Sequence, residues 1–138
     1  MTQHESRLSL RLELGDVVRL GPGKVRLLEL IDTTGSISAA GRAMGMSYRH
    51  AWLLVDSLNT AFREPIVATR AGGAADKRAA ITPFGRDLLE RFRRIEATAQ
   101  AAIAADLAAL EALLKPEAPP RRMRDPGSAA RDPKHTEP

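Results

Sequence analysis

Four consecutive residues, Ser47-Tyr48-Arg49-His50, bring hydrogen-bonding side chains together in one short stretch of chain. The guanidinium of Arg49 can donate two parallel bonds to guanine O6 and N7, which discriminates against a wrong base by about 1–3 kcal/mol. The tips of Tyr48 and His50 can bond phosphate oxygens. This pattern favours contact with double-stranded DNA, with Arg49 as the base reader. The alternative is that Arg49 is solvated or forms an ion pair with Asp56.

Two further groups of residues could contact phosphates. Ser36 and Ser38 lie at the start of an expected helix, where free N–H groups and the helix dipole favour an anion, although N-capping alone explains one of them. Arg70, Lys77 and Arg78 flank a glycine-bearing turn and could reach the minor groove or adjacent phosphates; the alternative is an ordinary solvated hairpin tip. The candidate DNA-binding residues are Ser36, Ser38, Ser47, Tyr48, Arg49, His50, Arg70, Lys77 and Arg78.

A helix-turn-helix over residues 35–54 would position the stretch Ser47-Tyr48-Arg49-His50. Gly45 suits the turn, because glycine enters left-handed backbone space at no steric cost. Ser47 follows as a plausible N-cap of the second helix. Ala40 and Gly41 are small enough for the two helices to cross closely. Such a unit usually lays its second helix in the major groove of DNA.

The second helix of this unit is expected over about residues 47–62, ending before Pro65, which cannot continue a helix. Trp52 falls outside its apolar stripe. Since a tryptophan is costly to expose, we expect Trp52 mainly to pack against the hairpin or the first strand, with a structural role.

Periodicity predicts the remaining elements on either side of this unit. Alternating leucines over residues 8–14 indicate a strand with one buried face. Apolar residues then recur at helical spacing after Gly21-Pro22-Gly23 until Gly35. The runs 66–69 and 79–82 are short and β-compatible, and together they predict a hairpin, interpreted as a wing.

A long helix is predicted from the N-cap Thr82 and Pro83 to about Leu114. Its length is on the order of 45 Å, more than a domain of this size needs for its own core, and its apolar positions step by three or four as in a coiled coil. We therefore expect a homodimer. The expected interface residues are Leu88, Phe92, Ile95, Ala99, Ile103, Leu107, Leu110 and Leu114.

Composition narrows the class of protein. The chain has 138 residues, no cysteine, three histidines and a formal net charge of +4, so we expect one domain with tails, no metal site and no cofactor. No paired carboxylates, nucleophile with a base or phosphate loop is visible, and we do not expect an enzyme. No segment has the length of an apolar membrane span, and we expect a cytoplasmic protein without membrane contact. The proline-rich residues 115–138 are expected to be disordered.

With these motifs in place, residues 8–96 resemble the N-terminal DNA-binding domain of the ModE-type molybdate-dependent transcriptional regulators of bacteria, and more loosely the winged helix of LysR-type regulators. The matching motifs include Gly45-Met46-Ser47-Tyr48-Arg49, Ala51-Trp52-Leu53-Leu54-Val55-Asp56 and Ile81-Thr82-Pro83-Phe84-Gly85. Gly41 stands where that family usually has alanine. Full-length members of that family carry a C-terminal oxyanion-binding region; in this chain we expect a Pro/Arg tail at that place.

The sequence thus predicts a mainly α fold with a small β wing: a winged helix-turn-helix over residues 1–82, a long dimerisation helix over 83–114, and a tail over 115–138. The expected function is sequence-specific binding of double-stranded DNA by a homodimer at a pseudo-palindromic operator, to regulate transcription. The alternative is an interaction protein that pairs with, and modulates, a full-length regulator.

Overall fold

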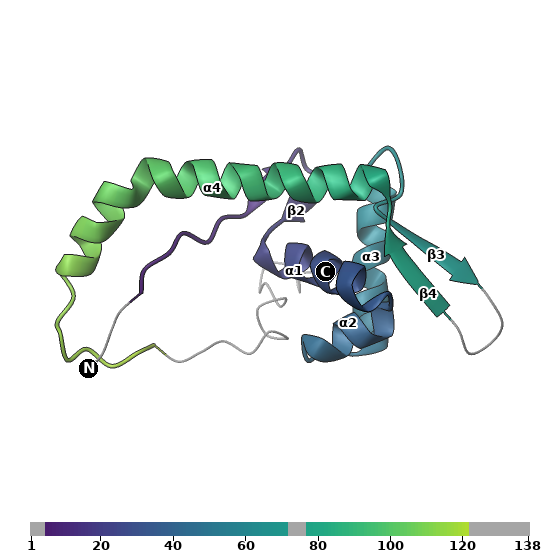
Figure 1. Ribbon diagram of the computed structural model, residues 1–138, viewed down its shortest axis with the longest axis horizontal. Coiled ribbons are helices and arrows are strands. Elements are labelled where there is room, and N and C mark those ends of the chain that lie inside the picture. Colours follow the sequence, from purple (N-terminus) through teal and green to yellow (C-terminus); the bar gives the residue numbers. More distant parts are fainter. Residues whose placement is uncertain (1–4, 72–76, 122–138) are drawn as a thin grey trace.

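The computed structural model describes residues 5–71 and 77–121. The fold is mainly helical, with two separate two-stranded sheets. Figure 1 shows three shorter helices and one hairpin gathered at one end of a long helix, which extends well beyond them. In chain order the elements are β1 (Leu12–Leu14), β2 (Val18–Leu20), α1 (Pro22–Thr34), α2 (Ile37–Ala43), α3 (Tyr48–Ala61), β3 (Val67–Ala71), β4 (Lys77–Ile81) and α4 (Pro83–Ala112).

Local capping chemistry sets the ends of α1, α2 and α3. Gly35 ends α1 in the left-handed conformation, with φ of 72°. The Ser36 hydroxyl then caps α2 by accepting a bond from the Ala39 N–H. Gly45 again takes φ of 72° in the turn, and Ser47 Oγ accepts a bond of 3.1 Å from the His50 N–H at the start of α3. These boundaries and caps confirm the predictions for the helix pair.

The core lies where α1 meets α2, α3, the hairpin and the first turns of α4. Helix α1 contributes the largest share, because it is covered on several sides. The fully buried large side chains are Val25, Leu27, Leu28, Ile31, Leu58, Ile66, Val67 and Phe92. At about 1.5–3 kcal/mol for each buried aliphatic or aromatic side chain, this cluster is the main stabilising term of the fold.

Close packing of α2 on α3 depends on a residue without a side chain. A Cβ at Gly41 would lie 2.9 Å from the Cβ of Ala51 on α3. This approach confirms the expectation that small residues allow the two helices to cross closely.

The strand predicted over residues 8–14 is only partly correct. Pairing is limited to Leu12–Leu14, which faces β2 across the turn at Gly15; β2 itself was not predicted. The preceding segment uses its backbone differently, since the Leu8 N–H donates a bond of 2.9 Å to Gln100 Oε1 on α4. The start of the predicted strand therefore bonds to a side chain of α4 and not to a neighbouring strand. The alternation of leucines could not predict this partner.

Strands β3 and β4 form the predicted antiparallel hairpin, with Val67 opposite Ile81 and Arg70 opposite Arg78. The residues between the strands, 72–76, lie outside the described residues, as do 1–4 and the part of the expected tail from 122 onward.

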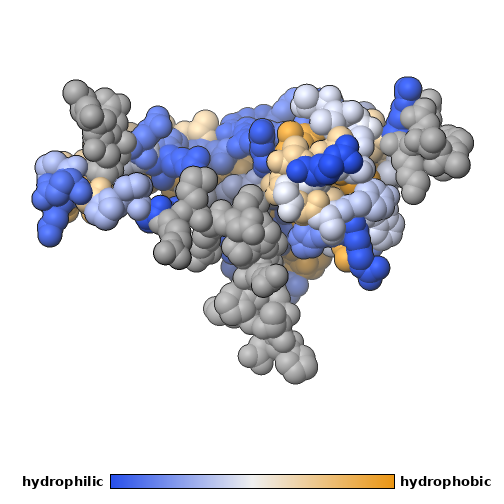
Figure 2. Space-filling model, turned by 90° about the horizontal axis from the view of Figure 1, so that it is seen from below, coloured by the Kyte–Doolittle hydropathy of each residue, from blue (hydrophilic) through white to orange (hydrophobic). Residues whose placement is uncertain are grey.

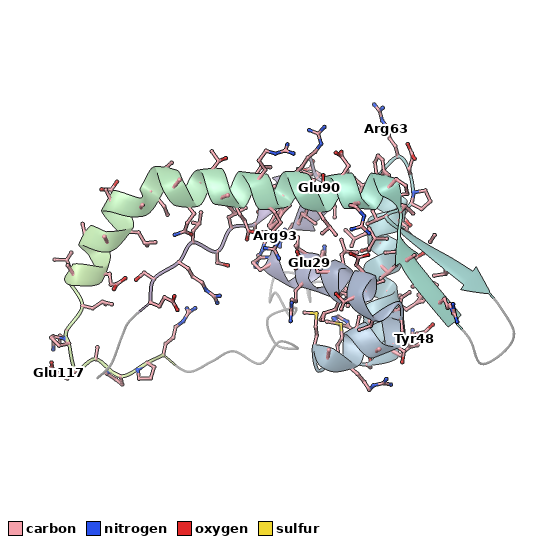
Figure 3. The ribbon with its side chains drawn as sticks, viewed as in Figure 1. Glu29, Tyr48, Arg63, Glu90, Arg93 and Glu117 are labelled. Atoms are coloured by element: carbon pink, nitrogen blue, oxygen red, sulfur yellow. The ribbon has the colours of Figure 1, made fainter. Side chains whose placement is uncertain are left out.

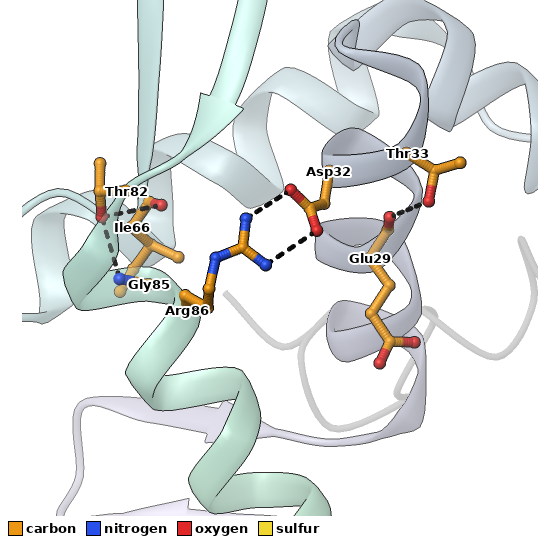
Figure 4. A network of polar contacts seen from close by, with 7 residues as sticks. All are labelled: Glu29, Asp32, Thr33, Ile66, Thr82, Gly85 and Arg86. Atoms are coloured by element: carbon orange, nitrogen blue, oxygen red, sulfur yellow. Dashed lines mark hydrogen bonds and ion pairs between the residues drawn. The ribbon is translucent and has the colours of Figure 1, made fainter.

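Helix α4 begins as predicted, with Thr82 as N-cap and Pro83 in the first turn. It ends at Ala112, two residues before the expected end at Leu114. The Thr82 hydroxyl also donates a bond of 2.6 Å to the Pro65 carbonyl, which ties the start of α4 to the entry of β3. Figure 4 shows Thr82, Ile66 and Gly85 meeting at this point.

Two arginines on α4 hold it against α1. Arg86 donates two bonds to Asp32, of 2.8 and 3.1 Å (Figure 4), and the hydrogen bond lowers the pKa of the Asp32 carboxyl. Arg93 donates to both carboxylate oxygens of Glu29, which lies beside it in Figure 3, and also to Glu96 on its own helix. These two arginines therefore fix α4 to α1.

Candidate nucleic-acid interface

The outward face of α3 is exposed over its first two turns. Ala51, Val55 and Leu58 are buried against the core, so the opposite face carries Tyr48 and Arg49, both exposed. In Figure 3, Tyr48 lies at the end of α3 remote from α4, below the hairpin. An N-capped helix end that projects in this way is suited to enter a groove.

Arg49 is exposed and available for an external contact. In the described part of the chain, no hydrogen bond or ion pair joins its side chain to Asp56 or to another residue. The structure therefore does not contain the Arg49–Asp56 pair, which was one alternative interpretation; the exposure of Arg49 agrees equally with the other, a solvated Arg49.

Trp52 corrects one expectation. It was expected mainly to pack against the hairpin or the first strand, but its side chain is 43% exposed, and the adjacent Leu53 is 47% exposed. The reason is geometric: Ala51 and Val55 are the buried residues on this part of α3, and Trp52 lies outside the buried face that they form. Figure 2 shows apolar surface, in orange, mixed with hydrophilic surface at the end of the molecule that holds the three short helices.

The other residues predicted on this unit lie close to the same helix ends. Ser36 and Ser47 are the caps of α2 and α3, so their hydroxyls already accept backbone bonds. Ser38 Oγ accepts a long bond of 3.4 Å from Arg42. His50 is half-buried. Capping thus accounts for the type of residue at two of these positions, independently of any phosphate contact.

The basic residues of the hairpin are placed by backbone register. Arg70 lies opposite Arg78, and Lys77 lies opposite Ala71. The side chains of Arg70 and Lys77 fall outside the described part of the structure. The hairpin backbone therefore brings three basic positions together next to its turn.

Asn59 fixes the hairpin relative to α3, and the sequence analysis missed it. Its amide oxygen accepts bonds from the backbone N–H groups of Ile66, at 2.8 Å, and Val67, at 3.1 Å; its amide nitrogen donates to the Val67 carbonyl at 3.0 Å. On the other side, the Ala79 N–H donates to the Gly35 carbonyl between α1 and α2. The only signal for Asn59 in the sequence is a polar residue on the inner side of a helix just before Pro65.

The predicted dimer seam divides into two parts. Phe92 is only 1% exposed within the single chain, and Leu88 is half-buried against the same core. The prediction that Phe92 faces a partner is therefore wrong, because the core of its own chain already covers it. Farther along, Ala99, Ile103 and Leu107 are half-buried, whereas Ile95, Leu110 and Leu114 are exposed.

No three side chains of the metal-binding types His, Cys, Asp and Glu come together within residues 5–71 and 77–121. Over the same residues, no helix has both the length and the apolar character that crossing a membrane requires.

The fold and this surface define a mainly helical protein that presents an N-capped, exposed helix beside a basic hairpin. Among proteins of known identity, the chain is 33% identical over 102 residues to the molybdenum transport protein ModE of Azotobacter vinelandii, covering 74% of this chain and 37% of that protein. It is 43% identical over 79 residues to the molybdenum-pterin-binding protein MopB of Rhodobacter capsulatus, covering 57% of this chain and 29% of that protein.

The DNA-binding transcriptional dual regulator ModE of Escherichia coli K12 is a more distant relative, 27% identical over 88 residues, or 64% of this chain and 34% of that protein. No protein-family model matches the chain. The relatives are ModE and Mop proteins, as the resemblance predicted, and the chain spans about a third of their length. Their names describe regulators, transport proteins and binding proteins.

Proposed function

We propose that this chain binds double-stranded DNA sequence-specifically and regulates transcription as a homodimer at a pseudo-palindromic operator. The observation that carries the proposal is the exposed N-terminal half of α3, with Arg49 on it forming no side-chain hydrogen bond or ion pair within the described part of the chain. The names of the ModE relatives, which include transcriptional regulators, support it.

In this proposal α1, α2, α3 and the β3–β4 hairpin act as a winged helix-turn-helix. Helix α3 has 14 residues, a length on the order of 21 Å, which fits lengthwise into a major groove about 12 Å wide. Arg49 reads a base there. Tyr48, His50 and the N-terminal turns near Ser36, Ser38 and Ser47 contact phosphates, and Arg70, Lys77 and Arg78 reach the backbone beside the groove.

Asp56 sets how much of α3 enters the groove. It is exposed on the same face as Arg49, seven residues later. A carboxylate is repelled by phosphates, which surround the groove on both sides. Contact with DNA is therefore confined to the first two turns of α3, before Asp56.

The homodimer in this proposal rests on the far part of α4. This helix has 30 residues, and Leu110 near its end is 62% exposed. The apolar side chains on this part of α4 form a row along the helix. Leaving them in water forgoes a stabilisation of about 25 cal/mol for each Å² of apolar surface. Pairing of α4 with its copy from Ile95 onward covers that row and holds two α3 helices at a fixed spacing.

Selection of bound duplexes from random DNA by the whole chain tests this function. We expect enrichment of two inverted half-sites whose centres lie about 34 Å apart, or a multiple of it, and sedimentation of the free protein as a dimer. Parallel selections with and without molybdate test for an effector, because two relatives are named for binding molybdenum.

Absence of enrichment over random DNA, or enriched sites without two-fold symmetry, would overturn the proposal. If the chain enriches sites only when mixed with a full-length relative, it acts instead as a heterodimerising modulator.

A further inference from the structure

The exposed face of α3 combines one cation with two large apolar side chains. Trp52 and Leu53 follow Arg49 by three and four residues, so both lie one turn beyond it on the outer surface. They are 43% and 47% exposed. Both neighbours of Arg49 in the next turn are thus apolar, an arrangement that differs from an ordinary solvated helix face.

The charges around this pair restrict what can cover it. Arg49 precedes it, Asp56 ends it one turn later, and the hairpin that Asn59 fixes beside α3 has Arg70 opposite Arg78. A covering surface must therefore be negative beside Arg49 and the hairpin, must end before Asp56, and must offer both hydrogen-bond acceptors and small apolar groups at its centre. The major groove of duplex DNA has this combination, since thymine presents a 5-methyl group beside the acceptors of purines.

We infer that Trp52 and Leu53 read thymine, by packing against the 5-methyl groups of thymines that neighbour the base contacted by Arg49. This inference rests on the proposed function and specifies part of the sequence that is recognised: each half-site contains at least one thymine whose methyl group is buried against α3. An apolar contact of this kind also explains why a tryptophan is left exposed in the free protein.

The expected effect is small but specific. Burial of one methyl-sized group is worth about 0.8 kcal/mol, which corresponds to about a fourfold change in affinity. Since no counterion is released by an apolar contact, this fourfold change is the same at low and high salt. A phosphate contact would behave differently, because its contribution falls steeply as salt rises.

Substitution of single thymines by deoxyuridine tests the inference directly. Deoxyuridine keeps the base pairing and the O4 acceptor of thymine and removes only the methyl group. In a duplex carrying a selected half-site, each thymine is replaced in turn, and the dissociation constant of the whole chain is measured. For the unaltered protein we expect an approximately fourfold loss at one or two positions, and no loss at the others.

The same duplexes are then measured with Trp52→Ala, Leu53→Ala and the control Val17→Ala. Val17 is 70% exposed in the β1–β2 turn, so its variant removes apolar surface elsewhere. The penalty for losing the methyl group should fall below about twofold in at least one α3 variant and stay unchanged in the control. Two controls show that each variant remains folded: its binding to random duplex and its thermal unfolding midpoint.

Three results would overturn the inference while leaving the proposed function intact: selected half-sites without thymine, no loss at any deoxyuridine position, or a penalty of twofold or more that persists in both α3 variants. The last result would assign the methyl contact to another element, and Trp52 and Leu53 to a protein partner. Failure to enrich any duplex would instead remove the proposed function itself.

Discussion

Gly85 on α4 packs directly against Ile66 at the entry of β3: a Cβ at position 85 would overlap the Ile66 carbonyl oxygen and lie 3.0 Å from its Cγ2. The same carbonyl accepts the Thr82 N–H at 3.0 Å, so the backbone cannot move aside without breaking a hydrogen bond. This contact sets how closely α4 approaches the hairpin and thereby, in the proposed dimer, where α3 and the hairpin lie relative to the second copy.

Gly85→Ala should lower the free energy of unfolding by about 1–3 kcal/mol, the usual cost of overpacking. Urea denaturation monitored by circular dichroism measures it. Gly23→Ala is the matched control, because a Cβ there meets open space at the start of α1; it should change stability by less than about 1 kcal/mol. Equal effects of the two substitutions would contradict the close contact.

The Asp32–Arg86 pair should make stability depend on pH. The hydrogen bond from Arg86 lowers the pKa of Asp32 below its ordinary value of 3.8 in the folded state. The pair therefore stabilises the fold above that ordinary value, and its contribution is lost as pH falls through the lowered one. Between about pH 6 and pH 2, unfolding free energy should fall less for Asp32→Asn than for the unaltered chain.

Asp16→Asn, in the exposed β1–β2 turn, is the control for this measurement. Urea midpoints at several pH values give the slopes. A steeper acid loss in Asp32→Asn than in the unaltered chain would show that the pair does not stabilise the fold.

Arg49→Ala should weaken binding to a selected operator by about 1–3 kcal/mol while leaving binding to random duplex nearly unchanged. Fluorescence anisotropy with both duplexes measures the difference. Arg63→Ala removes the same charge just beyond the far end of α3, where Figure 3 shows the side chain directed away from Tyr48, and should change neither affinity. Equal losses on both duplexes would make Arg49 a phosphate contact.

Replacement of both Lys77 and Arg78 by alanine should weaken binding to all duplexes alike. If each contacts a phosphate, the slope of log affinity against log salt becomes shallower by up to about 2. Arg91→Ala combined with Arg94→Ala removes the same charge from the exposed side of α4 and should leave the slope unchanged. An identical slope for the hairpin variant and the unaltered chain would remove the hairpin from the DNA-contacting surface.

Ile103→Glu should weaken the proposed dimer at least tenfold, or about 1.4 kcal/mol, because it places a carboxylate within the apolar row of α4. Sedimentation equilibrium gives the dimer dissociation constant. Ala104→Glu adds the same charge at the adjacent exposed position and should leave the dimer intact. A monomeric unaltered chain, or equal dimerisation of both variants, would contradict pairing through this row.

Features decided by near neighbours in the chain could be predicted from sequence. The turn at Gly45, the cap at Ser47 and the start of α4 at Thr82-Pro83 depend on residues within a few positions of one another, and each is confirmed. The hairpin was also predicted, because its two β-compatible runs are close in sequence. These are interactions for which residue type alone fixes the backbone.

Features decided by distant contacts could not be predicted in this way. Helical periodicity places Phe92 on an apolar row, but cannot tell whether α1 or a second copy covers that row. The exposure of Trp52 depends on which face of α3 is buried in the fold, and that face carries Ala51 and Val55. Asn59 became recognisable as a positioning residue only when its bonds to Ile66 and Val67 were seen, because a lone asparagine in a helix has many uses.

The side-chain hydrogen bonds of Arg86, Arg93 and Gln100, which join α4 to α1 and to the N-terminal segment, all lie before residue 101. In the proposed dimer the remaining turns of α4 act as a spacer. The position at which the two α4 helices pair determines the distance between the two operator half-sites. Insertion of one heptad after Gln100 would lengthen this part of each α4 helix by about 10 Å. In that dimer, the length of DNA between the preferred half-sites is therefore set by α4, away from every residue proposed to read a base.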